Sequence, residues 1–373
     1  MLNEIDKLRE IKSIGYFIDN TKHPQSIRLK LADFYYRTKN LQNVITVDES
    51  KKKIIDEILK RCLDLKDVAD NYLAGSPISA VKKAQEVLRQ LAKKKIDLTN
   101  YGFINLGGGQ GVELFTELEN SCSDFGLLIE YDFNSVKEFR KNQIPFQLKN
   151  SHRSIETEVI ECDLLDSKKL DIAKKIISEK KLDGIVVTIH AVLHELSTRS
   201  SFNFDMEVFF KHIYDFHDNI ILIIREPGIP ENWDDQVYIT VDTKYFDNFC
   251  DILEKVNGIH FSNKETNRTI FATGEILIDK RLAIEALTKL FYNEDLSYEL
   301  REQVSSMDQE KITKSLQASK FENIESEAFY TDSLTQNIEH YGVTYKGKDQ
   351  KIISKPHCFT YTISTKGSLK IKQ

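Results

Sequence analysis

The chain lacks the features that mark disulfide-rich, zinc-binding and membrane-spanning proteins. Its five cysteines are scattered through 373 residues and none forms a CxxC pair, so neither a disulfide framework nor a zinc knuckle is indicated. No apolar run approaches the ~20 residues that span a bilayer. The first residues, MLNEIDKLREIK, are charged throughout and lack the apolar segment of a secretory signal. These absences predict a cytoplasmic protein with reduced thiols and no membrane partner.

An excess of positive charge is also missing. The 52 basic and 58 acidic side chains give a net charge of −6, which argues against a surface built as a whole for nucleic acid. Hydrophobic residues (40%) and charged residues (29%) occur at the frequencies of ordinary soluble globular proteins. At roughly 150 residues per domain, the length allows two units, or one core with large additions.

The first 95 residues have the periodicity of helices. Apolar residues recur at helical spacing, for example at Ile27, Leu31 and Phe34, and again between Ala80 and Lys95. We therefore predict that residues 1–95 form an N-terminal helical region that acts as a lid.

After residue 100, short apolar runs alternate with helical segments. The predicted strands are residues 103–106, 126–130, 158–161, 184–188 and 219–224. Uninterrupted runs of this kind are typical of strands buried on both faces, and their alternation with helices predicts a doubly wound, mostly parallel α/β sheet. Two late strands, within 321–330 and at 357–364, follow a helix at 312–320 and predict an antiparallel hairpin at the far edge. The core would comprise residues 96–228 and 312–373.

The pattern loosens between residues 229 and 311. Short strands are predicted at 236–241 and 269–278, and helices at 282–291 and 298–307. Because the rhythm of the core resumes afterwards, we predict that residues 229–311 form a cap or substrate-binding insertion.

A glycine-rich turn is the most informative segment of the chain. The sequence FINLGGGQGVEL contains four glycines between positions 107 and 111, after a strand and before a helix. Glycines allow a ligand to approach the backbone, and the helix that follows offers unpaired N–H groups. A tight turn alone would need only one or two glycines. The dinucleotide pattern G-x-G-x-x-G requires a glycine or alanine where Val112 stands, so a nicotinamide cofactor is disfavoured.

This segment resembles motif I of the class I S-adenosylmethionine-dependent methyltransferases, a family with a Rossmann-like fold. The similarity continues in order through the next strands, covering about residues 100–228, and extends to 312–365 only through the strand pattern. The resemblance implies S-adenosyl-L-methionine as cofactor and methyl transfer as the reaction.

The resemblance also implies a set of cofactor-binding residues. Glu130 occupies the family's ribose-binding position, Asp163 its adenine-binding position, and Leu164 would pack on the adenine ring. The complete set is Asn105, Gly107, Gly108, Gly109, Gly111, Glu130, Tyr131, Asp132, Asp163, Leu164 and His190. Many members carry an acid where Asn105 stands, and this departure keeps a catalytically inactive module that binds the cofactor as an alternative.

Two histidines follow the fourth predicted strand. His190 and His194 are four residues apart, but their pattern is HxxxHE rather than HExxH and no third ligand is near, so no metal site is predicted. A histidine suits proton abstraction near neutral pH, and several O-methyltransferases of the family carry a similar His–acid pair. We hypothesise that His194 is the base, with Glu195 beside it, and that His190 is a pocket residue. The alternative is that both histidines only cap the helix or line the cofactor pocket.

Three further residues are candidates for contact with the methyl acceptor. Arg225 and Glu226 follow the fifth strand, and Trp233 follows a proline-containing turn; a structural ion pair and simple packing are the alternative roles. The predicted function is methyl transfer to a small-molecule acceptor. An RNA or protein methyltransferase of the same fold would need a basic groove, for which only the lysine-rich segments 51–53 and 93–95 offer support.

Overall fold

The computed structural model describes residues 77–199, 204–227, 235–241, 269–270, 275–289, 309–331, 334–335, 338–339 and 343–371. Except for Lys289, they belong to one compact unit that comprises Ala74–Val241, Arg268–Thr288 and Glu302–Gln373. The helices predicted before residue 77, the helix predicted at 298–307, and Trp233 lie outside the described residues.

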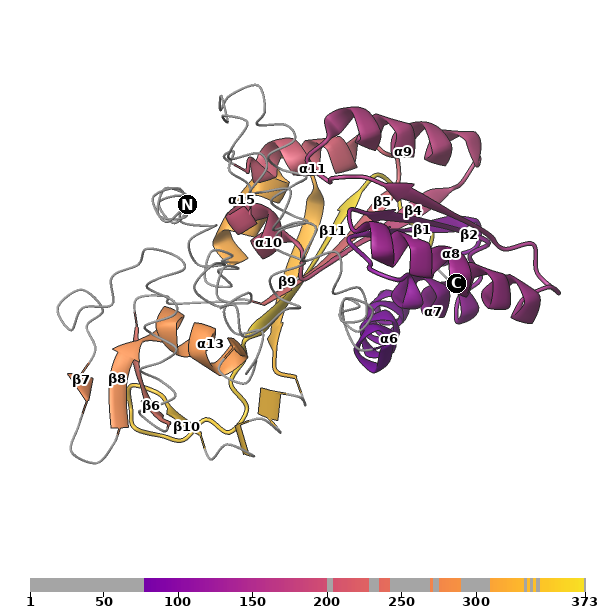
Figure 1. The fold of residues 1–373 in the computed structure, drawn as a ribbon. Coiled ribbons are helices and arrows are strands. Elements are labelled where there is room, and N and C mark those ends of the chain that lie inside the picture. Colours follow the sequence, from indigo (N-terminus) through magenta and orange to yellow (C-terminus); the bar gives the residue numbers. More distant parts are fainter. Residues whose placement is uncertain are drawn as a thin grey trace, which may run out of the picture. The chain divides into compact units, whose positions relative to one another are not determined.

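A seven-stranded sheet forms the centre of the fold (Figure 1). Its order is β3-β2-β1-β4-β5-β11-β9, with bounds β1 (Tyr101–Leu106), β2 (Phe125–Glu130), β3 (Glu156–Glu161), β4 (Gly184–His190), β5 (Ile220–Pro227), β9 (Glu322–Phe329) and β11 (Phe359–Lys366). The first five strands are parallel, whereas β11 runs antiparallel to both β5 and β9. The predicted Rossmann-like sheet with an antiparallel pair at its edge is confirmed.

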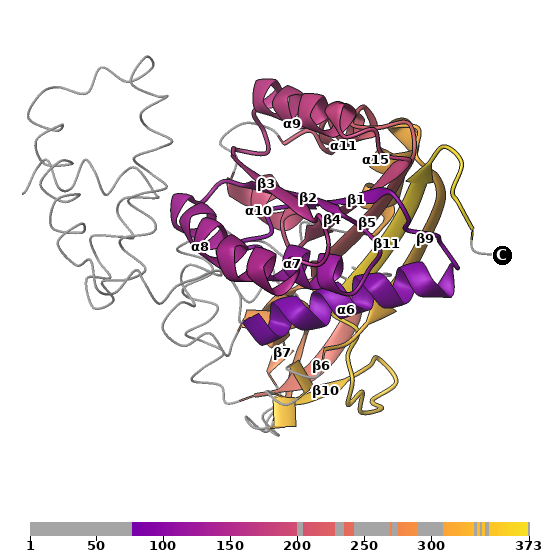
Figure 2. The ribbon, with the colours of Figure 1, turned by 90° about the vertical axis from the view of Figure 1, so that its right-hand side faces the viewer.

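Helices cover both faces of this sheet. Figure 2 shows α6 (Pro77–Lys93), α7 (Val112–Glu119) and α8 (Phe133–Lys149) on one face, and α9 (Ser167–Glu179), α11 (Met206–Tyr214) and α15 (Gln309–Ala318) on the other. A separate apolar cluster fills each side. Because β1, β2 and β4 are buried along their whole length, they read as continuous apolar runs in the sequence.

Two of the predicted helices end earlier than expected, because a residue with a left-handed backbone conformation follows each of them. The helix predicted at 80–95 is α6, which ends at Lys93, and the helix predicted at 312–320 is α15, which ends at Ala318. Two residues beyond each end, Lys95 and Lys320 have φ angles of 54° and 69°. A helix cannot continue through a left-handed residue, so each ends before it.

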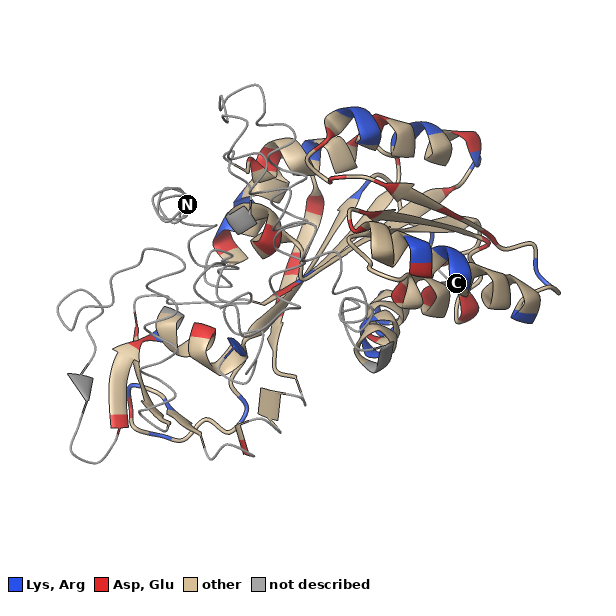
Figure 3. Cartoon of the chain, viewed as in Figure 1, with Lys and Arg blue, Asp and Glu red and all other residues tan. Residues whose placement is uncertain are grey.

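Surface charge on the outer helices is mixed. Along α8, for example, one acidic residue lies among four basic ones (Figure 3), and this residue, Glu138, forms an ion pair with Lys141 one turn away. Such exposed pairs contribute only about 0.3–0.5 kcal/mol each, so the packed apolar face stabilises the helix far more than they do.

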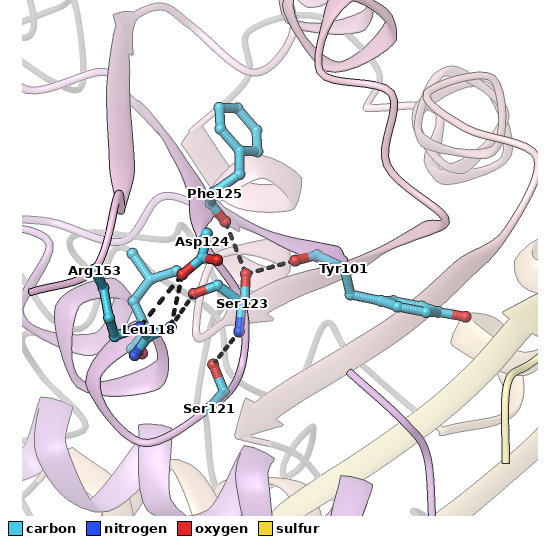
Figure 4. A network of polar contacts seen from close by, with 7 residues as sticks. All are labelled: Tyr101, Leu118, Ser121, Ser123, Asp124, Phe125 and Arg153. Atoms are coloured by element: carbon cyan, nitrogen blue, oxygen red, sulfur yellow. Dashed lines mark hydrogen bonds and ion pairs between the residues drawn. The ribbon is translucent and has the colours of Figure 1, made fainter. Parts of the chain in front are cut away.

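A polar network ties together the amino ends of the central strands (Figure 4). The Ser123 hydroxyl donates to the carbonyls of Tyr101 (2.5 Å) and Phe125 (3.1 Å), the first residues of β1 and β2. The Arg153 guanidinium donates to the Ser123 carbonyl (2.6 Å) and to the Asp124 carboxylate (3.0 Å). This network lies at the strand ends opposite to the glycine turn and has a structural role.

A second, smaller sheet is wholly antiparallel. Its order is β10-β6-β8-β7, with bounds β10 (Thr344–Lys346), β6 (Gln236–Thr240), β8 (Glu275–Asp279) and β7 (Thr269–Ile270), and α13 (Lys280–Lys289) follows β8. The single strand predicted at 269–278 is wrong: the structure has two strands there, β7 and β8, which pair with each other in antiparallel orientation. Strand β10 joins this sheet from within the 312–373 segment. No helix in the described parts of the chain is long and apolar enough to cross a membrane.

Candidate functional site

The sheet contains a topological switch point between β1 and β4. From β1 the chain proceeds outward through β2 and β3, then returns to the other side of β1 as β4 and β5. Open α/β sheets bind ligands at the carboxyl ends of strands at such a point. Here the glycine turn after β1 meets the loop after β4, since a Cβ atom added to Gly107 would lie 2.6 Å from Cγ2 of Val192.

The backbone of the glycine turn explains most of its glycines. Gly107, Gly109 and Gly111 have φ angles of 69°, 57° and 78°, a region that side chains disfavour. A Cβ atom on Gly111 would lie 2.2 Å from the Phe139 ring, and one on Gly108 would lie 2.8 Å from Leu128. The turn thus packs tightly against the strand and helix beside it, and this packing requires glycine whether or not a ligand is bound.

Glu130, the last residue of β2, holds the turn in place. Its Oε2 accepts from the N–H of Gly109 (2.7 Å), and its Oε1 accepts from the N–H groups of Tyr131 and Asp132 (2.9 Å each). Burial raises the pKa of Glu130, and these backbone donors oppose the rise. A carboxylate has about four acceptor positions, so Glu130 retains room for one further donor, as the ribose role requires.

The neighbours of Glu130 have other partners. Asp132 caps α8, with its carboxylate accepting from the N–H of Ser135 (2.7 Å). Tyr131 is exposed. The predicted contacts of both residues with a cofactor stay predictions.

The predicted adenine position lies after β3. Asp163 is exposed and accepts from the N–H of Leu165 (3.0 Å). Leu164 is buried in the core on the α9 side, whereas the Leu165 side chain is exposed. If a ring packs on this loop, Leu165 is the apolar side chain that is available to it.

Asn105 lies on β1 and is fully buried. In the amide orientation that satisfies both of its ends, it donates to Glu117 (3.0 Å) and Thr188 (3.1 Å) and accepts from the N–H of Leu114 (3.3 Å). Asn105 therefore faces α7. An acid at this position would face the carboxyl group of Glu117, which gives a physical reason for the departure from the family's pattern.

Two buried acids on α7 escaped the sequence interpretation. Glu113 and Glu117 alternate with Leu114 and Leu118 on the buried stripe of the helix, and this spacing was the available signal. Burial and the charge of Glu113 raise the pKa of Glu117 well above its ordinary value. Burial would also raise the pKa of Glu113, but the charge of His190 brings it below its ordinary value. The helix thus carries an ionised acid beside one that tends to stay protonated.

The two predicted histidines lie on different elements. His190 ends β4, and its Nδ1 is 2.6 Å from Oε1 of Glu113. His194 lies in the first turn of α10 (Leu193–Arg199), and its Nδ1 is 2.8 Å from Oε2 of Glu226. The pair therefore does not form a helical i, i+4 arrangement. In the described residues, no group of three or more His, Cys, Asp or Glu could hold a metal ion.

Glu226, predicted to contact the acceptor, organises the histidine loop. It is 1% exposed, and its Oε1 accepts from the N–H groups of Val192 and Leu193 (2.8 Å each) while Oε2 faces His194. Ala191, before this turn, has a left-handed φ of 61°. The end of β5 thus fixes the start of α10, and the acid that orients the His194 ring through Nδ1 is Glu226 from a distant strand. Glu195, predicted for this pairing, is half-buried beside it.

Arg225, the other residue predicted from β5, stacks on aromatic rings. Its Cζ lies 4.6 Å from the centroid of Phe359 and 5.4 Å from that of Phe329. Its role towards an acceptor stays a prediction, as does that of Trp233.

Neither a family model nor a curated protein matches the chain. Among solved structures, it is similar to a SAM-dependent methyltransferase from Archaeoglobus fulgidus, with 12% identity, a TM-score of 0.37 and coverage of 81% of this chain and 100% of that one. An O-methyltransferase family protein from Burkholderia thailandensis has 10% identity, a TM-score of 0.41 and coverage of 92% and 72%. The plantazolicin methyltransferase BpumL, in complex with SAH, has 10% identity, a TM-score of 0.37 and coverage of 86% and 91%. At these values the fold assignment rests on strand order and direction.

Proposed function

We propose that this chain is a cytoplasmic S-adenosylmethionine-dependent methyltransferase that methylates a hydroxyl group of a small-molecule acceptor. The observation that carries the proposal is the bond between Glu130 and the N–H of Gly109. It joins the glycine turn to an acid that has acceptor capacity left, at the switch point of the sheet. A nucleoside hydroxyl fits this acceptor position.

Two features argue against a dinucleotide cofactor. The dinucleotide-binding fold continues with a parallel sixth strand beside the fifth, whereas here the antiparallel β11 pairs with β5. Val112, which opens α7, stands where the dinucleotide pattern needs its third glycine or alanine. Both features favour a mononucleoside cofactor.

The residues of the loop after β4 fit the role of a general base. S-adenosylmethionine, when bound, supplies a methyl group on a sulfonium, which passes to the acceptor oxygen as the S–C bond breaks and the O–C bond forms. Glu226 holds the Nδ1 of His194, which favours the tautomer with the proton on Nδ1 and makes Nε2 the basic atom. Nε2 would take the proton of the acceptor hydroxyl.

Calorimetric titrations test the proposal at the level of the cofactor. S-adenosylmethionine and S-adenosylhomocysteine are expected to bind the wild-type chain, and NAD is not. Glu130→Gln should weaken both nucleosides by about tenfold or more, because the amide replaces an acceptor oxygen by a donor. Glu161→Gln is the matched control. This acid is exposed, and it is the Cα partner of Glu130 at the end of the neighbouring strand β3. Binding of NAD alone, or equal affinities in Glu130→Gln, would overturn the proposal.

A further inference from the structure

A row of polar residues crosses three strands at the carboxyl end of β4 and β5. His190, Arg225 and Tyr361 are Cα partners on β4, β5 and β11, so their side chains project from the same face of the sheet. This is the face that α6 and α7 cover (Figure 2). The polar row therefore lies beneath these two helices. The sequence named His190 and Arg225 as separate candidates, and no pattern in it joined them to Tyr361.

Helix α6 adds a cation to this row. Lys83 is half-buried beside the buried Ala84 and Val87, and it interacts electrostatically with Glu113 and Arg225. Burial lowers the pKa of Lys83; the charge of Glu113 opposes this change, and the charge of Arg225 adds to it. The fold thus brings two cations into one partly desolvated space, where Glu113, Glu195 and Glu226 act on Lys83 without forming an ion pair with it.

The acids near this space already have partners. The Glu226 carboxylate faces two backbone N–H groups and His194, and Glu113 faces His190. Within the part of the chain that the structure describes, by contrast, neither the Lys83 ammonium nor the Arg225 guanidinium has an ion-pair or hydrogen-bond partner. The rings of Phe329 and Phe359 hold the guanidinium instead. The donors of Lys83 and Arg225 are therefore left over, whereas both oxygens of the Glu226 carboxylate are occupied.

We propose that Lys83 and Arg225 bind a carboxylate group of the methyl acceptor, an inference that rests on the proposed function. A guanidinium held on an aromatic ring presents a planar fork that matches a carboxylate. A doubly charged group such as a phosphate dianion fits less well, because Glu113, Glu195 and Glu226 all act on Lys83 and would repel it. Glu195 and Glu226 both act on Lys83, so the bound acid would lie near the loop that carries His194.

Line broadening of carboxyl-¹³C benzoate by the full-length chain tests the site, with benzamide as the uncharged probe. The wild-type chain should broaden benzoate and leave benzamide sharp. Lys83→Met should weaken benzoate binding by about tenfold or more, and Arg225→Lys, which keeps the charge but loses the fork, by a smaller factor. Lys82→Met, an exposed neighbour on the same helix, is the matched control and should change nothing. Equal broadening in Lys83→Met and wild type, with unchanged circular dichroism in both, would overturn the proposal.

The carboxylate of the cofactor is the other source of this chemistry, and a second titration separates the two. Wild type and Lys83→Met are titrated with S-adenosylhomocysteine and with 5′-methylthioadenosine, which lacks the amino-acid end. If the ratio of S-adenosylhomocysteine affinity to 5′-methylthioadenosine affinity is the same in wild type and in Lys83→Met, the result supports an acceptor carboxylate. A selective loss of S-adenosylhomocysteine affinity in Lys83→Met would assign the pair to the cofactor and overturn the proposal. A wild-type chain that binds neither nucleoside contradicts the proposed function instead, while benzoate spectra without nucleoside still report on the site.

Discussion

Two buried histidines, four residues apart in the sequence, each face a buried glutamate. The two pairs differ in what surrounds the glutamate. The acid of the His194 pair, Glu226, also accepts from two backbone N–H groups, so its carboxylate is held from three sides. The acid of the His190 pair, Glu113, instead has a second buried acid, Glu117, as its neighbour on α7. In this second cluster Glu113 Oε1, Glu117 Oε1 and both ring nitrogens of His190 are buried without an aligned hydrogen bond.

The difference shows that the other partners of the acid decide what such a pair does. A carboxylate fixed by backbone donors keeps its position, and it can orient an imidazole for proton transfer. A carboxylate beside a second one is coupled to the proton of its neighbour, so its charge depends on the whole cluster. We therefore expect the His194 pair to control chemistry and the His190 cluster to control stability.

The largest effect should separate the two histidines. His194→Ala should lower kcat by about 10²–10⁴-fold through loss of the base, whereas His190→Ala should lower it by less than about tenfold. The measurement is release of S-adenosylhomocysteine at saturating cofactor, with a hydroxyl acceptor that the wild-type chain methylates. Unchanged turnover in His194→Ala would remove the distinction between the pairs.

The next effect tests the acid cluster. Asn105→Asp should destabilise the fold by about 3–5 kcal/mol, because it adds an uncompensated buried charge opposite Glu117. Combining it with Glu117→Gln should recover most of this loss. Urea unfolding of wild type, both single variants and the double variant measures the coupling, and additive changes would show that the two side chains do not interact.

Glu226→Gln should have a smaller effect, and on catalysis. The amide oxygen can still accept from Val192 and Leu193, but the amide nitrogen donates to Nδ1 of His194 and favours the wrong tautomer. We expect the activation barrier to rise by about 1.5–3 kcal/mol, the usual value of a hydrogen bond to a charged group. The pH profile of kcat should also move, which a purely structural role would not cause; an unshifted profile argues against orientation by Glu226.

The smallest effect concerns the pH dependence of stability. Glu117 has a higher pKa in the folded state than in the unfolded state, because burial and Glu113 favour its protonated form. Folded chains therefore retain a proton that unfolded chains release, and stability falls as the pH rises above about 4.3. The Glu117→Gln variant lacks this titrating group. The difference in unfolding free energy between the variant and wild type should therefore shift in favour of the variant as the pH rises, by at most about 1.4 kcal/mol per pH unit. Parallel stability curves between pH 5 and 8 would contradict the raised pKa.

Much of the fold could be predicted because its signals are local. Short apolar runs identified the five parallel strands, and the glycine spacing identified the turn, since backbone conformation constrains the residue at each of its positions. The helix ends were off by two residues because Lys95 and Lys320 adopt left-handed backbones that their residue type does not predict.

The site itself was only partly predictable. His190, His194 and Glu130 were recognised from their places after strands, and the structure brings Glu130 to the turn as expected. Glu113 was missed because an acid in a helix is ordinarily solvent-exposed. Only the packing of α7 against β4 shows that Glu113 lies beside His190. The predicted acceptor role of Glu226 came from its position at a strand end, which does not reveal which donors converge on it.

The sequence by itself determined the order of the five parallel strands and the conformation of the turn at Gly107–Gly111, because hydrophobic periodicity and allowed backbone angles act between residues close in the chain. Only the tertiary structure decided which charges meet. His194 pairs with an acid 32 residues away, and Lys83 shares its surroundings with Arg225 on a distant strand. Such pairings depend on which strands become neighbours and which face each helix covers, and that choice is made by burial of the whole core.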